Sequence, residues 1–149
     1  MRAVIQRVAQ AQVRVDQTIV GKIGQGLVVY LGVHAKDTEK EAEKLAHKIA
    51  HARVFEDADG KMNLSVQEIQ GSILSISQFT LIADTVKGNR PSYDQAARPE
   101  AADRLYRIFN EKLREFVLVE TGTFQAYMII DQTNDGPVTL IYETKEEQR

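Results

Sequence analysis

The sequence predicts a mixed α/β fold organised as one domain. Most of its patterned segments are typical of β-strands, and two amphipathic stretches are typical of helices. Its 149 residues can bury a sizeable core, and no repeat, linker or low-complexity segment divides them. We therefore expect a single domain over residues 1–149, whose last part, about 144–149, is a polar tail that frays.

Composition narrows the class of protein. The chain has no cysteine, which excludes a disulfide framework, a thiol nucleophile and a cysteine-ligated metal. A net charge of −2 argues against a general nucleic-acid coat but allows a local basic patch. No apolar run approaches the ~18 residues of a membrane span, and no signal segment opens the chain. We expect a cytoplasmic protein with no membrane partner.

Residues 1–33 predict β structure, because apolar residues recur at every second position near the start. Turns are expected at Asp16-Gln17 and over 21–26, and an apolar strand over 26–33. The glycines of 21–26 match no GxxxxGK[ST] pattern and no helix follows them. Hairpin turns therefore explain them better than a phosphate-binding loop does.

Two helices and several further strands follow. Thr38 and Glu41 predict a capping box at the start of the first helix, and Pro99 suits the first position of the second. Apolar residues at helical spacing predict two buried stripes, namely Ala42, Leu45, Ala46 and Ile49, and then Ala102, Leu105, Phe109, Leu113 and Phe116. Extended segments are expected at 53–55 and 61–65, around a turn at 59–60, and three closing strands at 117–120, 125–131 and 138–143.

The uncharged run from Ser72 to Ala83 is typical of a strand buried on both faces. Ser77, Gln78 and Thr80 lie in this run, and a buried hydroxyl or amide costs about 1–3 kcal/mol when it is unpaired. Bonds to neighbouring loops would satisfy these groups. Three of them together instead suggest a strand end that opens into a pocket.

A second unusual stretch is Asn-Asp-Gly-Pro-Val-Thr at 134–139. Such residues between two strands are typical of a turn. The Gly136-Pro137 bond can also be cis at a cost of only about 0.5–1 kcal/mol, since glycine relieves the crowding that proline imposes. A cis bond would direct two backbone carbonyls one way with no side chain between them, which makes a rigid wall of acceptors.

Two further groups have both a structural and a functional interpretation. His47 and His51 are four residues apart on the first helix. No HExxH pattern surrounds them, so solvated histidines are favoured over a metal site. Lys87 and Arg90 lie in a loop predicted over 84–98, where they form either a phosphate contact or an ordinary solvated surface.

The motif Ser-Gln-Phe-Thr-Leu at 77–81, together with the stretch at 134–139, resembles the D-aminoacyl-tRNA deacylase family of the D-tyrosyl-tRNA deacylase type. The resemblance covers nearly the whole chain, including the opening Met-Arg-Ala-Val-Ile-Gln-Arg-Val and the segments 55–65 and 83–92. Departures are small. Asn89 lies inside the Lys-Gly-x-Arg-Pro-Ser run, and Tyr93 follows it where phenylalanine is common.

The resemblance implies a homodimeric enzyme without a cofactor or metal. Its reaction would be hydrolysis of the ester between a D-amino acid and the 3′-terminal adenosine of tRNA, and glycyl-tRNA would also be accepted. The implied fold is a compact β/β/α arrangement of curved sheets with two main helices packed outside. Gly136-Pro137 should be cis and enter the partner subunit's pocket, where its carbonyls reject L-amino acids. We expect no DNA partner.

Ser77, Gln78, Phe79 and Thr80 are then the catalytic candidates. Thr80 is a nucleophile by residue type, but the sequence offers no evident base for it. We favour a route in which N–H groups at Gln78 and Phe79 hold the carbonyl oxygen, while Ser77 and Gln78 position the ester. The resemblance suggests that the ribose 2′-hydroxyl helps to activate the attacking water.

Supporting roles are expected for Arg7, Met62, Asn134 and Thr139, and tRNA backbone contacts for Lys87 and Arg90. Arg7 would hydrogen-bond carbonyls and orient the Gly-Pro element, or else be an ordinary surface charge. Met62 and Phe79 would flank the adenine or the substrate, or else belong to the core. The competing functions are a non-catalytic tRNA-binding module and a metal-dependent hydrolase built on the two helical histidines.

Overall fold

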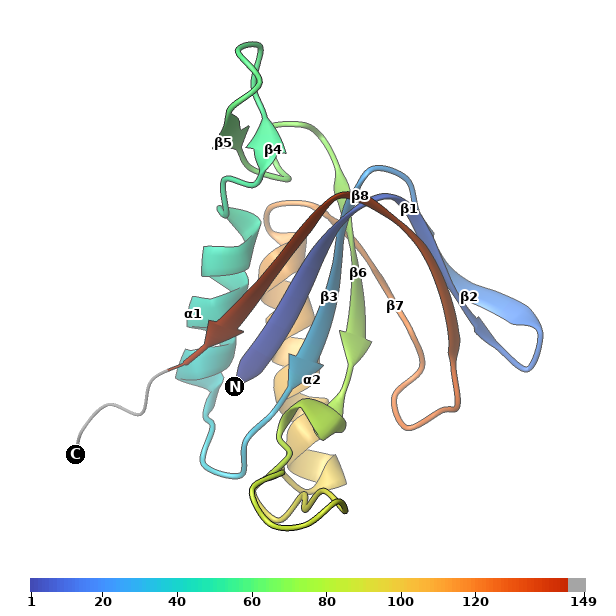
Figure 1. The fold of residues 1–149 in the computed structure, drawn as a ribbon, viewed down its shortest axis with the longest axis vertical. Helices are drawn as coiled ribbons and strands as arrows, with labels where there is room; N and C mark the ends of the chain where they lie inside the picture. The colour runs from blue at the N-terminus through green and yellow to red at the C-terminus, as the bar shows by residue number, and fades with distance from the viewer. Residues whose placement is uncertain (145–149) are drawn as a thin grey trace.

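The computed structural model describes residues 1–144, and its centre is a six-stranded sheet (Figure 1). The strands are β1 (Arg2–Val15), β2 (Thr18–Ile23), β3 (Gly26–Gly32), β6 (Ser72–Ser77), β7 (Leu118–Thr121) and β8 (Ile129–Glu143). Their order is β2-β1-β3-β6-β7, and β8 pairs with β1. Strand β1 pairs antiparallel with β2, β3 and β8, whereas β6 is parallel to β3 and β7. The long strands β1 and β8 bend over together, which curves the sheet (Figure 1).

Two helices, α1 (Glu39–Ala50) and α2 (Pro99–Arg114), pack side by side against one face of the sheet (Figure 1). The predicted capping box at Thr38 is present, and Pro99 begins α2 as expected. Both predicted stripes are buried except Phe116, which follows the end of α2 and is half-buried. Neither helix of residues 1–144 is long and apolar enough to cross a membrane.

The core lies on both faces of the sheet, and β6 contributes to both. Ile73 packs in the cluster beneath the helices, while Leu74 and Ile76 belong to the cluster on the opposite face. The prediction of a doubly buried strand is therefore confirmed, but its length was wrong, because β6 ends at Ser77. Its neighbour β3 ends at the same level, so no strand remains to pair with the residues that follow. The chain turns there into a 3₁₀ helix, η1 (Phe79–Leu81).

The predicted turns near the start of the chain are partly confirmed. Asp16 and Gln17 both have positive φ, as a two-residue hairpin turn requires. The turn predicted over 21–26 is shorter, because Gly21 lies inside β2. A Cβ there would lie 2.7 Å from the carbonyl oxygen of Thr121, so this glycine permits close packing of β2 rather than a turn.

The three predicted closing strands are two in the structure. The segment 117–120 corresponds to β7, and 138–143 lies within the single strand β8. Of the predicted strand 125–131, only 129–131 belong to β8, and residues 125–128 precede it without strand structure. A small two-stranded sheet, β4 (Phe55–Glu56) with β5 (Met62–Leu64), projects beyond α1 (Figure 1). The predicted tail lies outside the described residues apart from Thr144, whose N–H donates to the Met1 carbonyl.

Candidate active site

The stretch at 134–139 is a bulge inside β8 and not a turn between strands. On β1 only Arg7 lies between Gln6 and Val8, whereas their partners on β8, Thr139 and Asn134, are separated by residues 135–138. Proline cannot donate to a strand ladder and is tolerated inside a sheet at such bulges. The residues that suggested a turn therefore loop outward while the strand continues on both sides.

The tip of this bulge is exposed backbone. The Gly136–Pro137 peptide is cis, the geometry that the resemblance implied, and both residues are exposed. Gly136 has φ of +133°, a conformation that residues with a side chain rarely adopt. A Cβ at this position would also lie 2.9 Å from the Val138 nitrogen and 3.2 Å from an Arg7 nitrogen. The site therefore requires glycine on two separate grounds.

Arg7 holds the bulge from below. Its side chain is buried, and Nε donates to the Asp135 carbonyl at 3.0 Å while Nη1 donates to the Val54 carbonyl at 2.9 Å. The Asp135 carboxylate lies 3.9 Å from Nε and adds a weak ion pair. Of the two interpretations left open by the sequence, Arg7 therefore matches the one in which it binds carbonyls. Its two bonds join the bulge to the segment that leads into β4.

The Ser77–Thr80 motif lies where β6 gives way to η1. Gln78 Nε2 donates to Thr80 Oγ1 at 2.5 Å, and both Phe79 and Thr80 are exposed. The Phe79 ring meets Tyr93 edge to face at 5.2 Å. Among residues 1–144, the hydrogen-bond partner found for the Thr80 hydroxyl is an amide, and no histidine or carboxylate is bonded to it.

One detail of the expected oxyanion site is wrong. The Gln78 N–H donates to the Leu31 carbonyl at 2.8 Å, so it is already engaged in extending the β3–β6 pairing by one bond. The first N–H groups of a helical turn have no acceptor within that turn. The Phe79 and Thr80 N–H groups at the start of η1 are therefore the donors that geometry leaves for a substrate carbonyl.

The structure does not bring the two motifs together within one chain. The bulge is level with Arg7 on β1, which pairs with Leu27 on β3, which in turn pairs with Ile73 on β6. From β8 to β6 there are three strand spacings, about 14 Å, and Ser77 lies a further four residues, about 13 Å, along β6. A site that uses both motifs needs the bulge of a second chain.

The supporting residues occupy different surroundings. Asn134 and Thr139 join a polar ladder: Gln132 Nε2 donates to Gln6 Oε1 at 2.8 Å and to Asn134 Oδ1, and Gln6 Nε2 approaches Thr139 Oγ1 at 3.4 Å. Sequence reasoning missed the two glutamines, because nothing but the β1–β8 register places them opposite the motif. Met62 is 56% exposed beside the turn of the β4–β5 hairpin, so its interpretation as a core residue is wrong.

Tyr30 completes this ladder from the neighbouring strand. Its hydroxyl donates to Gln132 Oε1 at 2.7 Å. Burial raises the pKa of Tyr30 above its ordinary value, so the hydroxyl remains a donor at neutral pH. The ladder therefore fixes the side-chain orientation of Gln132, which in turn contacts Asn134 at the edge of the bulge.

The basic candidates lie in the loop that follows η1, whereas the histidine candidates lie at the C-terminal end of α1. Lys87 and Arg90 are exposed in the loop between η1 and α2, which an Asp84–Ser92 bridge closes at its base. His47 and His51 stack on each other at 4.1 Å. No group of three or more metal-ligating side chains gathers within residues 1–144, so the histidines give the metal-hydrolase alternative no support.

Comparison with known proteins gives a consistent result. The family model described as D-Tyr-tRNA(Tyr) deacylase matches residues 4–143. A solved structure of a protein named c-Myc DNA unwinding element binding protein is 43% identical, with a TM-score of 0.93 over 98% of this chain and 100% of that chain.

A second solved structure is described as a "probable eukaryotic D-amino acid tRNA deacylase". It is 18% identical, with a TM-score of 0.83 over 95% of this chain and 97% of that chain. At this identity the likeness bears on the fold alone. It confirms the expected α/β fold of a curved sheet with two helices outside.

Proposed function

The chain belongs to the D-Tyr-tRNA(Tyr) deacylase family and is a D-aminoacyl-tRNA deacylase, and from this premise we propose how it selects and hydrolyses its substrate. The substrate is a D-amino acid esterified to the 3′-terminal adenosine of tRNA. The products are the free amino acid and tRNA. Glycyl-tRNA is a second substrate, and the enzyme works in the cytoplasm as a homodimer.

The observation that carries the proposal is the Gly136–Pro137 bulge. Its backbone is exposed at the tip and tied down by the buried guanidinium of Arg7, so its carbonyls form a rigid surface without side chains. The bulge is also far along the sheet from Ser77–Thr80 of its own chain, which supports a site shared between two subunits.

Chirality is then selected by exclusion. With the ester held at η1 of one subunit, the carbonyls of the partner's bulge occupy the space that an L side chain would need. A D side chain points away from them, and glycine has no side chain to exclude. Selection of this kind depends on a repulsive contact with the wrong substrate and not on affinity for the right side chain.

Hydrolysis proceeds by attack of water on the ester carbonyl. The N–H groups of Phe79 and Thr80 stabilise the developing oxyanion, and the side chains of Ser77 and Gln78 position the ester. The ribose 2′-hydroxyl helps to activate the water. The ester C–O bond then breaks, the ribose oxygen takes a proton, and the amino acid leaves with the oxygen of the water.

Lys87 and Arg90 bind the tRNA backbone from the exposed loop beside this site. The related protein named for a DNA unwinding element makes DNA a natural comparison ligand. We propose tRNA rather than DNA as the nucleic-acid partner, because the family model that matches residues 4–143 is described as a tRNA deacylase.

The test is a deacylation assay with D-, L- and glycyl-tRNA prepared on the same tRNA. Release of D-amino acid and glycine, with the L-ester left intact, supports the proposal. Binding of tRNA without release from any ester would support the non-catalytic module instead. Equal hydrolysis of the D- and L-esters would remove the role given to the bulge.

A further inference from the structure

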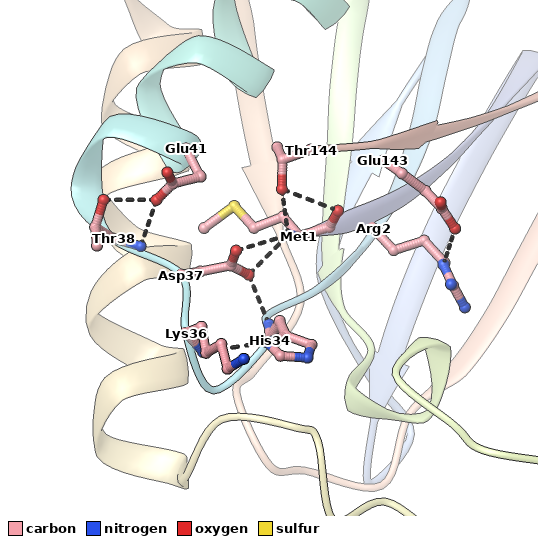
Figure 2. Close-up of polar contacts among 9 residues, drawn as sticks. All are labelled: Met1, Arg2, His34, Lys36, Asp37, Thr38, Glu41, Glu143 and Thr144. Carbon is pink, nitrogen blue, oxygen red and sulfur yellow. Dashed lines mark hydrogen bonds and ion pairs between the residues drawn. The ribbon is translucent and has the colours of Figure 1, made fainter. Parts of the chain in front are cut away.

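Arg2 links the end of β8 to η1, the turn of the candidate site. It is the first residue of β1, and its Nε donates to Glu143 Oε1 at 2.6 Å, a contact visible in Figure 2. Its Nη1 donates to the Leu81 carbonyl at 2.8 Å. Leu81 is the last residue of η1, so one guanidinium joins the end of β8 to the turn that carries Phe79 and Thr80.

Besides the Phe79–Tyr93 ring contact and the Gln78–Thr80 hydrogen bond, the turn is held by backbone contacts. Gly32 lies directly opposite Arg2 on β3, and a Cβ on Gly32 would lie 2.9 Å from Leu81 Cβ and 3.1 Å from the Gln78 carbonyl oxygen. The turn therefore rests against the backbone at the end of β3. The Gln78 N–H is fixed to the Leu31 carbonyl, which anchors the start of η1.

The far end of η1 depends on Arg2. The turn has three residues, no side-chain cap and no fully buried residue, so few contacts oppose a small rotation. Its Gln78 end is fixed by the backbone, while Leu81 is fixed by the Arg2 bond. Glu143 in turn holds the guanidinium plane, because Arg donates in a rigid fork that an ammonium group cannot reproduce.

We propose that Arg2 is a positioning residue for the deacylation reaction. It sets the orientation of η1, and thereby of the Phe79 and Thr80 N–H groups that face the ester oxygen. This inference rests on the proposed use of those groups in catalysis. It assigns Arg2 no contact with the substrate, and its effect belongs in kcat, since a displacement of about 1 Å can cost as much as 10²-fold in rate.

The experiment measures kcat and KM for D-aminoacyl-tRNA in Arg2→Gln, Arg2→Lys and Glu143→Gln. The expected result for Arg2→Gln is a fall in kcat of roughly tenfold, with KM within about twofold. Arg2→Lys should recover part of this loss, because an ammonium can still reach one of the two acceptors. Glu143→Gln, which leaves the Leu81 bond in place, should cost less than Arg2→Gln.

Arg104→Gln is the matched control. It removes the exposed ion pair between Arg104 on α2 and Glu39 on α1, and it leaves η1 untouched. Its kcat should equal that of the wild type. Thermal unfolding of Arg104→Gln and of Arg2→Gln should show similarly small losses of stability.

Three outcomes would overturn the proposal. One is an unchanged kcat in Arg2→Gln. Another is a raised KM with a flattened salt dependence, which would make Arg2 a tRNA contact. The third is a loss of kcat that merely tracks a large loss of stability. Gln78→Ala, measured in parallel, tests the proposed catalytic site separately from the role of Arg2. If Gln78→Ala abolishes turnover while Arg2→Gln does not reduce kcat, the proposed site is supported and the role of Arg2 is contradicted.

Discussion

Arg7 is the residue on which the geometry of the bulge most depends. Its side chain is buried, and its guanidinium donates hydrogen bonds to two backbone carbonyl oxygens. The sequence could place it only as one of two alternatives, a carbonyl-binding residue or a surface charge. A period-two pattern does not reveal that the opposite strand carries extra residues, and it is these that supply the Asp135 carbonyl.

Replacing Arg7 should therefore affect both stability and selectivity. Arg7→Ala leaves the Asp135 and Val54 carbonyls unpaired, and we expect the free energy of unfolding to fall by about 2–4 kcal/mol. Arg7→Lys should lose less stability but still hydrolyse D-esters with a lower D-to-L rate ratio. Urea unfolding and paired deacylation assays measure the two effects. Arg14→Ala, which removes a half-buried arginine on the same strand that pairs with Asp131, is the control, and an equal response from it would contradict the role of Arg7.

Thr80 separates two chemical routes. If water is the nucleophile, Thr80→Ala should lower kcat by less than about tenfold, because the N–H groups that hold the oxyanion belong to the backbone. Thr80→Ser keeps the hydroxyl and serves as the control. Near-complete loss of turnover in Thr80→Ala, with tRNA binding unchanged and activity restored in Thr80→Ser, would identify the side chain as the nucleophile.

At the scale of elements, helices were predicted more accurately than strands. The start of α1 follows from local chemistry, the Thr38–Glu41 box, and the start of α2 from Pro99. Strand ends depend instead on where the neighbouring strand stops. This is why the long apolar run was expected to continue to Ala83, although β6 ends when β3 can no longer pair with it.

The capping box of α1 makes a pH-dependent prediction. The Thr38 hydroxyl donates to Glu41 and is the main reason that the pKa of this carboxyl is lowered. A lowered pKa in the folded state means that the carboxylate stabilises the fold above its unfolded pKa. This contribution is lost as the pH falls through the folded pKa.

Glu41→Gln should therefore be less stable than the wild type at neutral pH, by roughly 0.5–1 kcal/mol. The difference should shrink as the pH falls through the lowered pKa of Glu41 in the folded state, because the wild-type carboxyl then becomes protonated. Thermal unfolding across this pH range measures it, with Glu43→Gln as the control on the same helix. A difference that stays constant with pH would contradict the account of the cap.

The basic loop makes a prediction about tRNA affinity. If Lys87 and Arg90 each neutralise one phosphate, Lys87→Ala/Arg90→Ala should reduce the slope of log K against log salt by roughly 1.4–1.8. Binding titrations with deacylated tRNA at several salt concentrations measure the slope. Lys44→Ala/Arg107→Ala removes the same charge from the helices and should leave the slope unchanged. An unaltered slope in the loop variant would place both residues outside the interface.

At the scale of the whole molecule, β1 organises the arrangement. It pairs with β2, β3 and β8. Its first residue, Arg2, contacts η1, and its C-terminal half pairs with β2. The sequence motifs indicated the family and hence the fold. They could not indicate the separation of the two motifs along the sheet, because this follows from the register of four strands, β8, β1, β3 and β6.

The same separation is the reason for expecting a shared site. The bulge lies exposed on β8, about three strands away from the strand that ends at Ser77. In the proposed mechanism, a single chain therefore holds its catalytic segment and its selectivity element too far apart to act together. Two chains that exchange their bulges would complete both sites at once, as two-fold symmetry allows.

A mixed dimer tests this central claim most directly. One subunit carries Gly136→Ala, which displaces the bulge. The other carries Gln78→Ala, which removes the side chain proposed to position the ester and whose homodimer is first shown to be inactive; separate affinity tags isolate the mixed species. If the site is shared, the intact turn of the first subunit meets the intact bulge of the second. The mixed dimer should then hydrolyse D-aminoacyl-tRNA with the D-to-L rate ratio of the wild type. A ratio equal to that of the Gly136→Ala homodimer would mean that each turn is guarded by its own chain, and would contradict the account.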